Sequence, residues 1–304
     1  MYKIQLGKSG LSVPTMAVGC MRISNMAEKD VSALVDTALS SEVNFFDHAD
    51  IYGDGGSEVV FGKVISSISR ESIIIQDKCG IVPGKMYDFS YEHIISSVDG
   101  SLKRLNTDYI DVLLLHRPDA LFEPEEVAKA FDLLKTLGKV RHFGVSNQNP
   151  YQIALLQKYL DMPVCANQMQ FGIMHMPSVQ SGMNFNMMNE YGVDRDGGVI
   201  DYCRLNDITI QTWSSLQYGF FEGCFVDNDR FPELNRVLSE LAEKYSVSKT
   251  TIAIAWILRH PARMQPVTGT TNPERLKECF RAADVTLTRE EWYKVYLATG
   301  SFLP

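Results

Sequence analysis

Short apolar segments alternate with amphipathic ones along almost the whole chain. Several of the apolar segments, such as DVLLLH, are near-continuous runs, which is typical of parallel strands that are covered on both faces. We therefore expect eight strands, at 15–19, 44–47, 73–78, 110–116, 141–146, 164–168, 209–214 and 265–268.

Helical patterns fill the intervals between these strands. Asn149-Pro150 and Asn272-Pro273 have the form of an N-cap followed by proline at the first helical position. One apolar stripe at helical period is formed by Leu234, Val237, Leu238, Leu241, Ala242 and Tyr245. About eight strand–helix units predict a closed (β/α)8 TIM barrel, with residues 1–304 forming a single domain. A doubly wound open sheet is the alternative, because the number of strands alone does not prove closure.

The segment 172–197 interrupts this alternation. It is rich in Met, Asn and Gly and weakly periodic, and a loop of this length in a compact domain is usually functional or disordered. A strand-like run follows soon afterwards, so we expect a loop over the barrel mouth. Its methionines could line an adaptable apolar pocket or simply pack against the barrel rim.

Composition and charge narrow the classes of function. Of the 304 residues, 45% are hydrophobic and 22% are charged, as in soluble globular proteins. The net charge of -8 gives no basic surface for nucleic acid or anionic lipid. No secretory signal or membrane span is visible, and the six scattered cysteines fit a reducing compartment. We expect a cytoplasmic protein without a nucleic-acid or membrane partner; the sequence leaves its oligomeric state open.

Four polar residues follow the predicted strands at places where a parallel barrel carries its chemistry. Asp47 and Tyr52 come after the second strand, Lys78 ends the third, and His116 ends the fourth. A lysine that closes so apolar a strand needs a counter-charge if it is buried, and Asp47 on the preceding strand can supply it. Each residue alone could be structural, as a buried ion pair or a core imidazole. Their combination points to a catalytic site.

These positions resemble the motifs of the aldo-keto reductases, and the resemblance covers nearly the whole chain. The family's FDTAxxYG has its counterpart in FDHADIYG, which contains Asp47 and Tyr52. Lys78 and His116 match the family's lysine and histidine after its third and fourth strands. Further matches are Gly144-Val145-Ser146-Asn147 after strand five, Asn167-Gln168 after strand six, and TNPER near the C-terminus.

The resemblance implies reduction of small-molecule carbonyl compounds by NADP(H), with NAD(H) also possible. Tyr52, a neutral phenol at cellular pH, would donate the proton to the carbonyl oxygen. Lys78, held by Asp47, would lower the pKa of Tyr52 and stabilise the phenolate. His116 would orient the carbonyl through a hydrogen bond.

The resemblance also implies where the cofactor lies across the barrel mouth. Ser146, Asn147 and Gln168 would hold the nicotinamide carboxamide, and Trp213 would stack on the nicotinamide, although a tryptophan here could also be a core residue. Ser214 and Leu216 would meet the pyrophosphate.

At the adenosine end, the resemblance assigns Thr270 and Arg275 to the 2′-phosphate and Glu278 to the vicinity of the adenine. The helix that GTTNPERLKEC opens can receive a phosphate at its N-terminus. Gly269 stands where many NADPH-specific members carry a basic residue, so the preference for NADPH is expected to be less strict.

Two other classes of function stay open at this stage. One is a metal-dependent barrel hydrolase that uses Asp47, His48, Asp50 and His116 as ligands. The other is a non-catalytic NADP(H)-binding sensor or partner subunit, because a fold and a bound cofactor do not guarantee turnover. We expect no metal site, since a proton relay accounts better for these residues. His48 has no assigned role, and Asp50 is expected to serve the adjoining turn.

Overall fold

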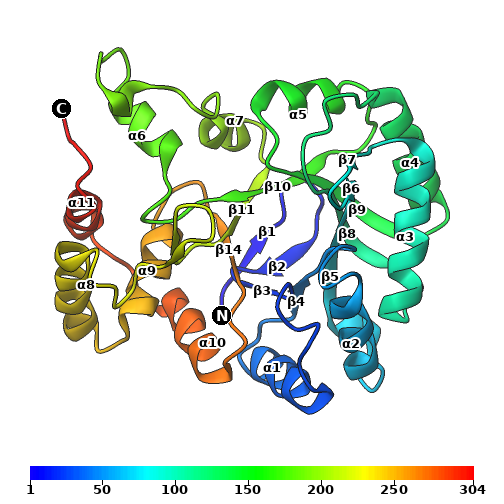
Figure 1. The fold of residues 1–304 in the computed structure, drawn as a ribbon, viewed down its shortest axis with the longest axis horizontal. Coiled ribbons are helices and arrows are strands. Elements are labelled where there is room, and N and C mark those ends of the chain that lie inside the picture. Colours follow the sequence, from blue (N-terminus) through cyan, green and yellow to red (C-terminus); the bar gives the residue numbers. More distant parts are fainter.

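The computed structural model describes every residue from Met1 to Pro304, and a closed barrel of eight parallel strands lies at its centre (Figure 1). Neighbours around the barrel follow the order β10-β11-β14-β3-β4-β5-β8-β9. The barrel strands are β3 (Ala17–Gly19), β4 (Phe45–Asp47), β5 (Ile74–Cys79), β8 (Ile110–Leu115), β9 (Val140–Ser146), β10 (Val164–Gln170), β11 (Thr209–Trp213) and β14 (Gln265–Thr268). The predicted barrel is confirmed, and the open sheet is wrong.

Helices surround the barrel, and at least one follows every strand (Figure 1). They are α1 (Glu28–Ser40), α2 (Gly56–Ile65), α3 (Tyr91–Leu105), α4 (Pro124–Thr136), α5 (Pro150–Gln157), α6 (Pro177–Met183), α7 (Val199–Leu205), α8 (Pro232–Tyr245), α9 (Lys249–Leu258), α10 (Pro273–Phe280) and α11 (Arg289–Ala298). Three 3₁₀ turns lie at η1 (Arg70–Ser72), η2 (Glu190–Gly192) and η3 (Arg281–Asp284). None of the helices combines the length and the apolar composition that a transmembrane span requires.

The helix boundaries follow the capping residues of the sequence. Asn149 caps α5 by accepting a hydrogen bond from the backbone N–H of Gln152, whose side chain bonds back to Asn149. Asn272 caps α10 by accepting from the backbone N–H groups of Glu274 and Arg275. Both helices start with the expected proline. The stripe predicted around Leu234 is the buried face of α8.

Two hydrophobic cores hold the barrel together. The larger fills the space between the strands and the helices, which is why β5, β8 and β10 are buried along their whole length. The smaller lies inside the barrel at its N-terminal end. There Leu6 and Val13, from the hairpin β1 (Lys3–Gln5) and β2 (Ser12–Pro14), pack against the strand residues Phe45 and Ile74. The hairpin thus closes the floor of the barrel and leaves the opposite end, the mouth, open.

Two further hairpins and the long segment 172–197 lie among the connections that follow the barrel strands. The hairpins are β6 (Ile81–Val82) with β7 (Met86–Tyr87), and β12 (Gln217–Tyr218) with β13 (Gly223–Cys224). The segment 172–197 contains α6 and the turn η2, so it is more regular than its sequence predicts. Its methionines divide: Met176 is buried, whereas Met187 and Met188 are exposed.

A pair of tryptophans joins α9 to α11. The rings of Trp256 and Trp292 stack with their centroids 4.6 Å apart, and the indole N–H of each donates to the backbone carbonyl of the other at 3.0 and 3.1 Å. Trp256 is fully buried and also stacks on Phe171. The pair fastens the last helix of the chain to the barrel.

Replacing Trp256 by Ala should lower the free energy of unfolding by about 3–5 kcal/mol, the range for removing a large buried aromatic side chain. Chemical denaturation followed by circular dichroism would measure the change. Tyr151→Ala is the matched control, because this aromatic side chain is 85% exposed and its loss should cost less than about 0.5 kcal/mol. Equal losses in the two variants would contradict the role of the tryptophan pair.

Candidate active site

A buried lysine connects two strands and a tyrosine at the barrel mouth. Lys78 Nζ donates to Asp47 Oδ2 at 2.8 Å, to the backbone carbonyl of His48 at 2.7 Å, and to the hydroxyl of Tyr52 at 3.2 Å. Asp47 and Lys78 are 2% and 1% exposed. The ammonium therefore has three oxygen partners for its three hydrogens, which is what a charge in this setting requires.

Burial and charge act in opposite directions on these groups. Burial opposes the charged form of Lys78, but Asp47 and Tyr52 outweigh it and raise the pKa of Lys78 above its ordinary value. Burial also raises the pKa of Tyr52, and Lys78 only partly offsets this effect. The sequence led us to expect a lowered pKa for Tyr52. Desolvation of the phenolate dominates over the charge of Lys78, so Tyr52 is a protonated phenol at neutral pH.

His116 stands beside this group, directly after β8. Its ring meets the ring of Tyr52 edge to face, with the centroids 5.9 Å apart. Burial, together with the charges of Lys78 and Arg117, lowers the pKa of His116 well below its ordinary value. The imidazole is therefore neutral near pH 7, with one N–H available as a donor.

His48 and Asp50 make no side-chain hydrogen bond to this group and have other neighbours. The His48 ring packs against Phe61 of α2 with the centroids 4.4 Å apart, and both of its nitrogens are buried without a partner. Burial and the charge of Lys78 lower the pKa of His48 to about 3, so it is neutral. Burial and nearby Glu58 raise the pKa of Asp50 to about 7, and Asp50 lines a separate small cavity. Nowhere in the chain do three His, Cys, Asp or Glu side chains meet in a way that could hold a metal ion.

The residues expected at the nicotinamide end come from neighbouring strands on the other side of the mouth. Ser146 ends β9 and Asn147 follows it, and the Ser146 hydroxyl donates to the backbone carbonyl of Gln168 on β10 at 2.8 Å. Asn147 has a left-handed backbone (φ 56°), and its amide donates to Ser146 Oγ at 2.8 Å. The side chain of Gln168 points into the barrel and donates to Asp47 Oδ1 at 2.9 Å. Gln168 thus links the two halves of the site.

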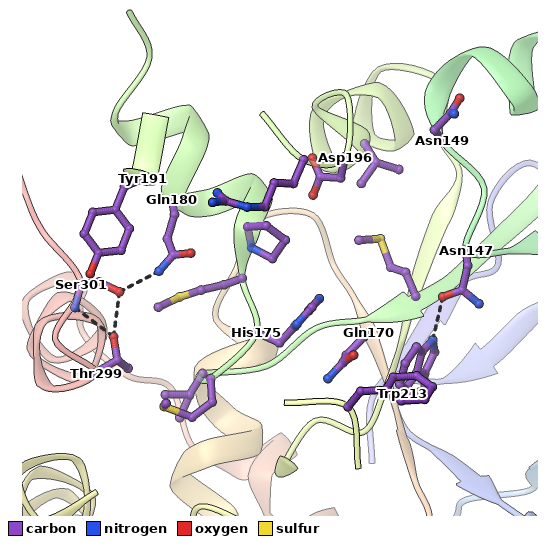
Figure 2. Close-up of a pocket in the computed structure, with 18 of the residues that line it drawn as sticks. Asn147, Asn149, Gln170, His175, Gln180, Tyr191, Asp196, Trp213, Thr299 and Ser301 are labelled. Atoms are coloured by element: carbon purple, nitrogen blue, oxygen red, sulfur yellow. Dashed lines mark hydrogen bonds between the residues drawn. The ribbon is translucent and has the colours of Figure 1, made fainter. Parts of the chain in front are cut away.

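Trp213, at the end of β11, is half-buried rather than a core residue. Its indole N–H donates to Asn147 Oδ1 at 3.2 Å, as Figure 2 shows. Phe221 stacks on its ring with the centroids 5.9 Å apart, and the guanidinium of Arg117 lies 5.4 Å from the ring centroid. The indole therefore has one polar anchor and an aromatic neighbour at the mouth.

The residues expected at the phosphate end follow β11 and β14, which are adjacent strands. Ser214 has a left-handed backbone (φ 52°), which turns the chain sharply after Trp213. Thr270 lies just before α10, and its hydroxyl accepts from the backbone N–H of Asn272 at 3.2 Å. Arg275 lies in the first turn of α10 and is exposed; Leu216 and Glu278 are half-buried.

A cavity of about 730 Å³ opens beside Trp213 and Asn147 (Figure 2). The segment 172–197 supplies much of its wall, including His175, Gln180 and Asp196. Eight of its 21 lining residues are hydrophobic, yet apolar atoms form the larger share of its exposed wall, with polar side chains set among them. Met174 and Met176 line it as the sequence suggested, and polar side chains stand beside them.

The sequence analysis missed a set of glutamines inside the barrel. Gln76, Gln211 and Gln265 are fully buried and lie close to Asp47 and Gln168. A signal was present, because each glutamine stands within a predicted strand, where an uncharged polar side chain needs a buried partner. The sequence alone gave no means of telling which partners would meet across the barrel.

Comparison with known proteins agrees with this geometry. The sequence profile of the aldo/keto reductase family matches residues 15–296. The uncharacterized oxidoreductase YcsN of Bacillus subtilis is 32% identical over 317 residues, with 99% of each chain covered. The 6-dehydroglucose reductase of Agrobacterium fabrum is 32% identical over 306 residues, covering 95% of this chain and 96% of the relative.

Among solved structures, a thermostable aldo-keto reductase in complex with the inhibitor epalrestat has the same fold. The two structures superpose with a TM-score of 0.78 over 98% of this chain and 100% of the other, at 24% sequence identity. The family match over nearly the whole chain and the full-length relatives lead to one conclusion. This chain belongs to the aldo/keto reductase family, and it is an NAD(P)H-dependent oxidoreductase that acts on small-molecule carbonyl compounds.

Proposed function

We propose that this protein reduces aldehydes or ketones to alcohols with NADPH and that Tyr52 is the proton donor. The observation that carries the proposal is the position of Lys78, which donates hydrogen bonds to both Asp47 and the hydroxyl of Tyr52. A phenol beside a fixed, buried cation can give up its proton where negative charge develops on a substrate oxygen.

Each of the four polar residues has one task in this mechanism. Bound NADPH supplies the hydride that adds to the carbonyl carbon. Tyr52 donates its proton to the carbonyl oxygen, and Lys78 stabilises the phenolate that Tyr52 becomes. Asp47 keeps Lys78 charged and in place. His116 is neutral and donates a hydrogen bond that orients the carbonyl oxygen beside Tyr52.

The amide groups at the mouth fit a nicotinamide carboxamide. Gln168 offers its side-chain oxygen and Asn147 its side-chain amide, and the carboxamide needs one acceptor and one donor. Ser146 holds the side chain of Asn147 at 2.8 Å. We infer that Trp213 stacks on the nicotinamide. Binding of the carboxamide to Asn147 would then replace the hydrogen bond that Asn147 accepts from the indole.

At the other end of the cofactor we assign Ser214 and Leu216 to the pyrophosphate, Thr270 and Arg275 to the 2′-phosphate, and Glu278 to the adenine edge. The exposed guanidinium of Arg275 in the first turn of α10 supports a phosphate site, since helix N-termini favour anions. Arg275 therefore favours NADPH over NADH.

Polar and charged side chains in the wall of the cavity beside Trp213 support a hydroxylated or anionic carbonyl substrate. Arg117 lines this cavity with its guanidinium 5.4 Å from the ring centroid of Trp213, where a substrate oxygen could meet it. The name of the Agrobacterium relative refers to an oxidised sugar, which is consistent with such a wall. The hydrolase alternative has no comparable support, because the His48 ring packs against Phe61 and Asp50 lines a separate cavity.

A panel of carbonyl compounds tests the proposed function directly. NADPH oxidation should be seen with aldehydes or ketones, and kcat/KM should be higher for hydroxylated or carboxylated compounds than for apolar compounds of equal size. The polar and charged side chains in the wall of the cavity are the reason for this order. If no carbonyl compound is reduced, the proposed function is wrong; if apolar compounds are preferred, the assignment of the substrate class is wrong.

Tyr52→Phe keeps the ring but removes the proton that the mechanism requires. We expect normal folding, near-normal NADPH binding and a reduction rate that falls by at least about 10²–10⁴-fold, the usual contribution of general acid catalysis. Steady-state kinetics and cofactor titration would measure both quantities. His48→Leu is the control, since the His48 nitrogens have no partners to lose. An active Tyr52→Phe together with an inactive His48→Leu would contradict the mechanism.

Arg275→Ala should weaken NADPH binding by about 1.5–3 kcal/mol, because it removes a charge-assisted hydrogen bond to the 2′-phosphate. NADH lacks this phosphate, so its affinity should change little. Titration of both cofactors would show the difference. Lys277→Ala is the control on the same helix, where the lysine is paired with Glu274. A loss of equal size for NADPH and NADH would rule out this role of Arg275.

A further inference from the structure

A chain of amide side chains crosses the inside of the barrel beneath the mouth. Gln76, Gln168, Gln211 and Gln265 are each at most 2% exposed. They occupy paired positions on neighbouring strands: Gln76 lies opposite Asp47, and Gln211 lies opposite both Gln168 and Gln265. One polar layer therefore extends from β4 and β5 across the barrel to β10, β11 and β14.

At the floor of the barrel, this row of hydrogen-bonded glutamines begins at a backbone carbonyl. Gln265 Nε2 donates to the carbonyl oxygen of Pro14, the last residue of β2, at 2.7 Å. Gln211 Nε2 donates to Gln265 Oε1 at 2.8 Å. A backbone carbonyl can only accept a hydrogen bond, so it forces the amino group of Gln265 toward the floor. The oxygen of Gln265 then requires the amino group of Gln211.

The amide orientations at the mouth end of the row are also set by which groups can donate and which can accept. Gln211 has turned its amino group to Gln265, so its oxygen accepts from Gln76 Nε2 at 2.8 Å and from Gln168 Nε2 at 3.2 Å. The second hydrogens of these two amino groups go to Asp47 Oδ1, at 2.6 and 2.9 Å. One carboxylate oxygen of Asp47 thus receives two amide donors, while the other receives Lys78.

The arrangement leaves a buried oxygen without a partner. Gln76 Oε1 is sealed from solvent and accepts no hydrogen bond. Such an atom lowers stability, and an apolar side chain at position 76 would avoid the loss. Flipping the Gln76 amide would instead place its oxygen against the Asp47 carboxylate. The layer is therefore arranged around Asp47 at some expense to stability.

Gln168 is the member of the chain that reaches the cofactor end. Both hydrogens of its amino group are engaged by Asp47 and Gln211. Its oxygen accepts no bond from the protein and, unlike that of Gln76, is not among the sealed atoms. A planar amide whose amino group is held in this way can present only its oxygen to a ligand.

We propose that Gln211 and Gln265 are positioning residues for the reductase. Anchored on the Pro14 carbonyl, they fix the amide orientation of Gln76 and Gln168, so that two donors face Asp47 and the oxygen of Gln168 is free for the amino group of the nicotinamide carboxamide. This inference rests on the proposed NADPH-dependent function. It adds a route by which the floor hairpin sets the geometry of both halves of the active site.

The test compares NADPH with its 3-acetylpyridine analogue, in which a methyl group replaces the amino group of the carboxamide. The wild-type chain should bind the analogue about tenfold more weakly, the effect of one lost hydrogen bond. In Gln211→Met the amide of Gln168 can turn, so this ratio should fall to about twofold. Misplacement of Asp47 should also lower kcat by about 10- to 100-fold.

Gln265→Leu is the second variant, and it decides the matter if Gln211→Met does not fold. It removes the anchor on Pro14 and the acceptor for Gln211 but leaves Gln211 itself in place, and it should shift the binding ratio in the same direction. Val112→Ala is the control, because Val112 lies beside Gln76 in the same barrel layer but takes no part in the hydrogen bonds between the glutamines. This variant loosens the core without touching the glutamines, so it should keep the wild-type ratio of the two affinities. If loosening of the core were enough to change the ratio, Val112→Ala would change it as well.

Three results would overturn the inference. The first is a wild-type chain that reduces carbonyls with NADPH but binds NADPH and the 3-acetylpyridine analogue equally tightly, because Gln168 would then not meet the carboxamide. The second is a folded Gln211→Met or Gln265→Leu with the wild-type ratio and kcat. The third is an equal change in Val112→Ala. A wild-type chain that reduces no carbonyl with NADPH would instead refute the proposed function, and the inference with it.

Discussion

The ion pair between Lys78 and Asp47 is the interaction on which the rest of the site depends. Both groups are almost completely buried, so neither charge is tolerable without the other. Removing one partner of such a pair typically costs about 3–5 kcal/mol, because it leaves an uncompensated charge in the interior. The parallel barrel makes the pair possible, because it places the ends of β4 and β5 side by side at the mouth. The remaining hydrogens of the ammonium then go to the His48 carbonyl and the Tyr52 hydroxyl.

The two halves of the barrel mouth carry different groups of residues. The strands β4, β5 and β8 carry the ion pair, Tyr52 and His116, whereas the residues that we assign to the cofactor follow β9, β10, β11 and β14. Gln168 connects the halves, since it stands among the cofactor residues and donates to Asp47. The cavity beside Trp213 opens on the cofactor side, under the segment 172–197. A long loop on a rigid barrel can thus shape the cavity while the group formed by Asp47, Lys78 and Tyr52 stays fixed.

The sequence predicted the fold more completely than the site. The eight strands could be located because buried parallel strands are nearly continuous apolar runs, and the N-caps at Asn149 and Asn272 are local signals. The contact of Asp47 with Lys78 followed from adjacent strand ends. The glutamine layer could not be predicted, because strand periodicity shows which side chains share a face but not which of them meet across a closed barrel. The raised pKa of Tyr52 was also missed, since desolvation depends on packing that the sequence does not show.

The central claim is that hydride from NADPH goes to a carbonyl carbon next to Tyr52 while the proton comes from the protein. The most direct measurement uses NADPH carrying deuterium at C4 of the nicotinamide, with the product alcohol analysed by nuclear magnetic resonance. The account predicts that one of the two C4 positions transfers its deuterium, and that this deuterium appears on the carbinol carbon of a single enantiomer. Product without deuterium from either position, or deuterium lost to water, would contradict it.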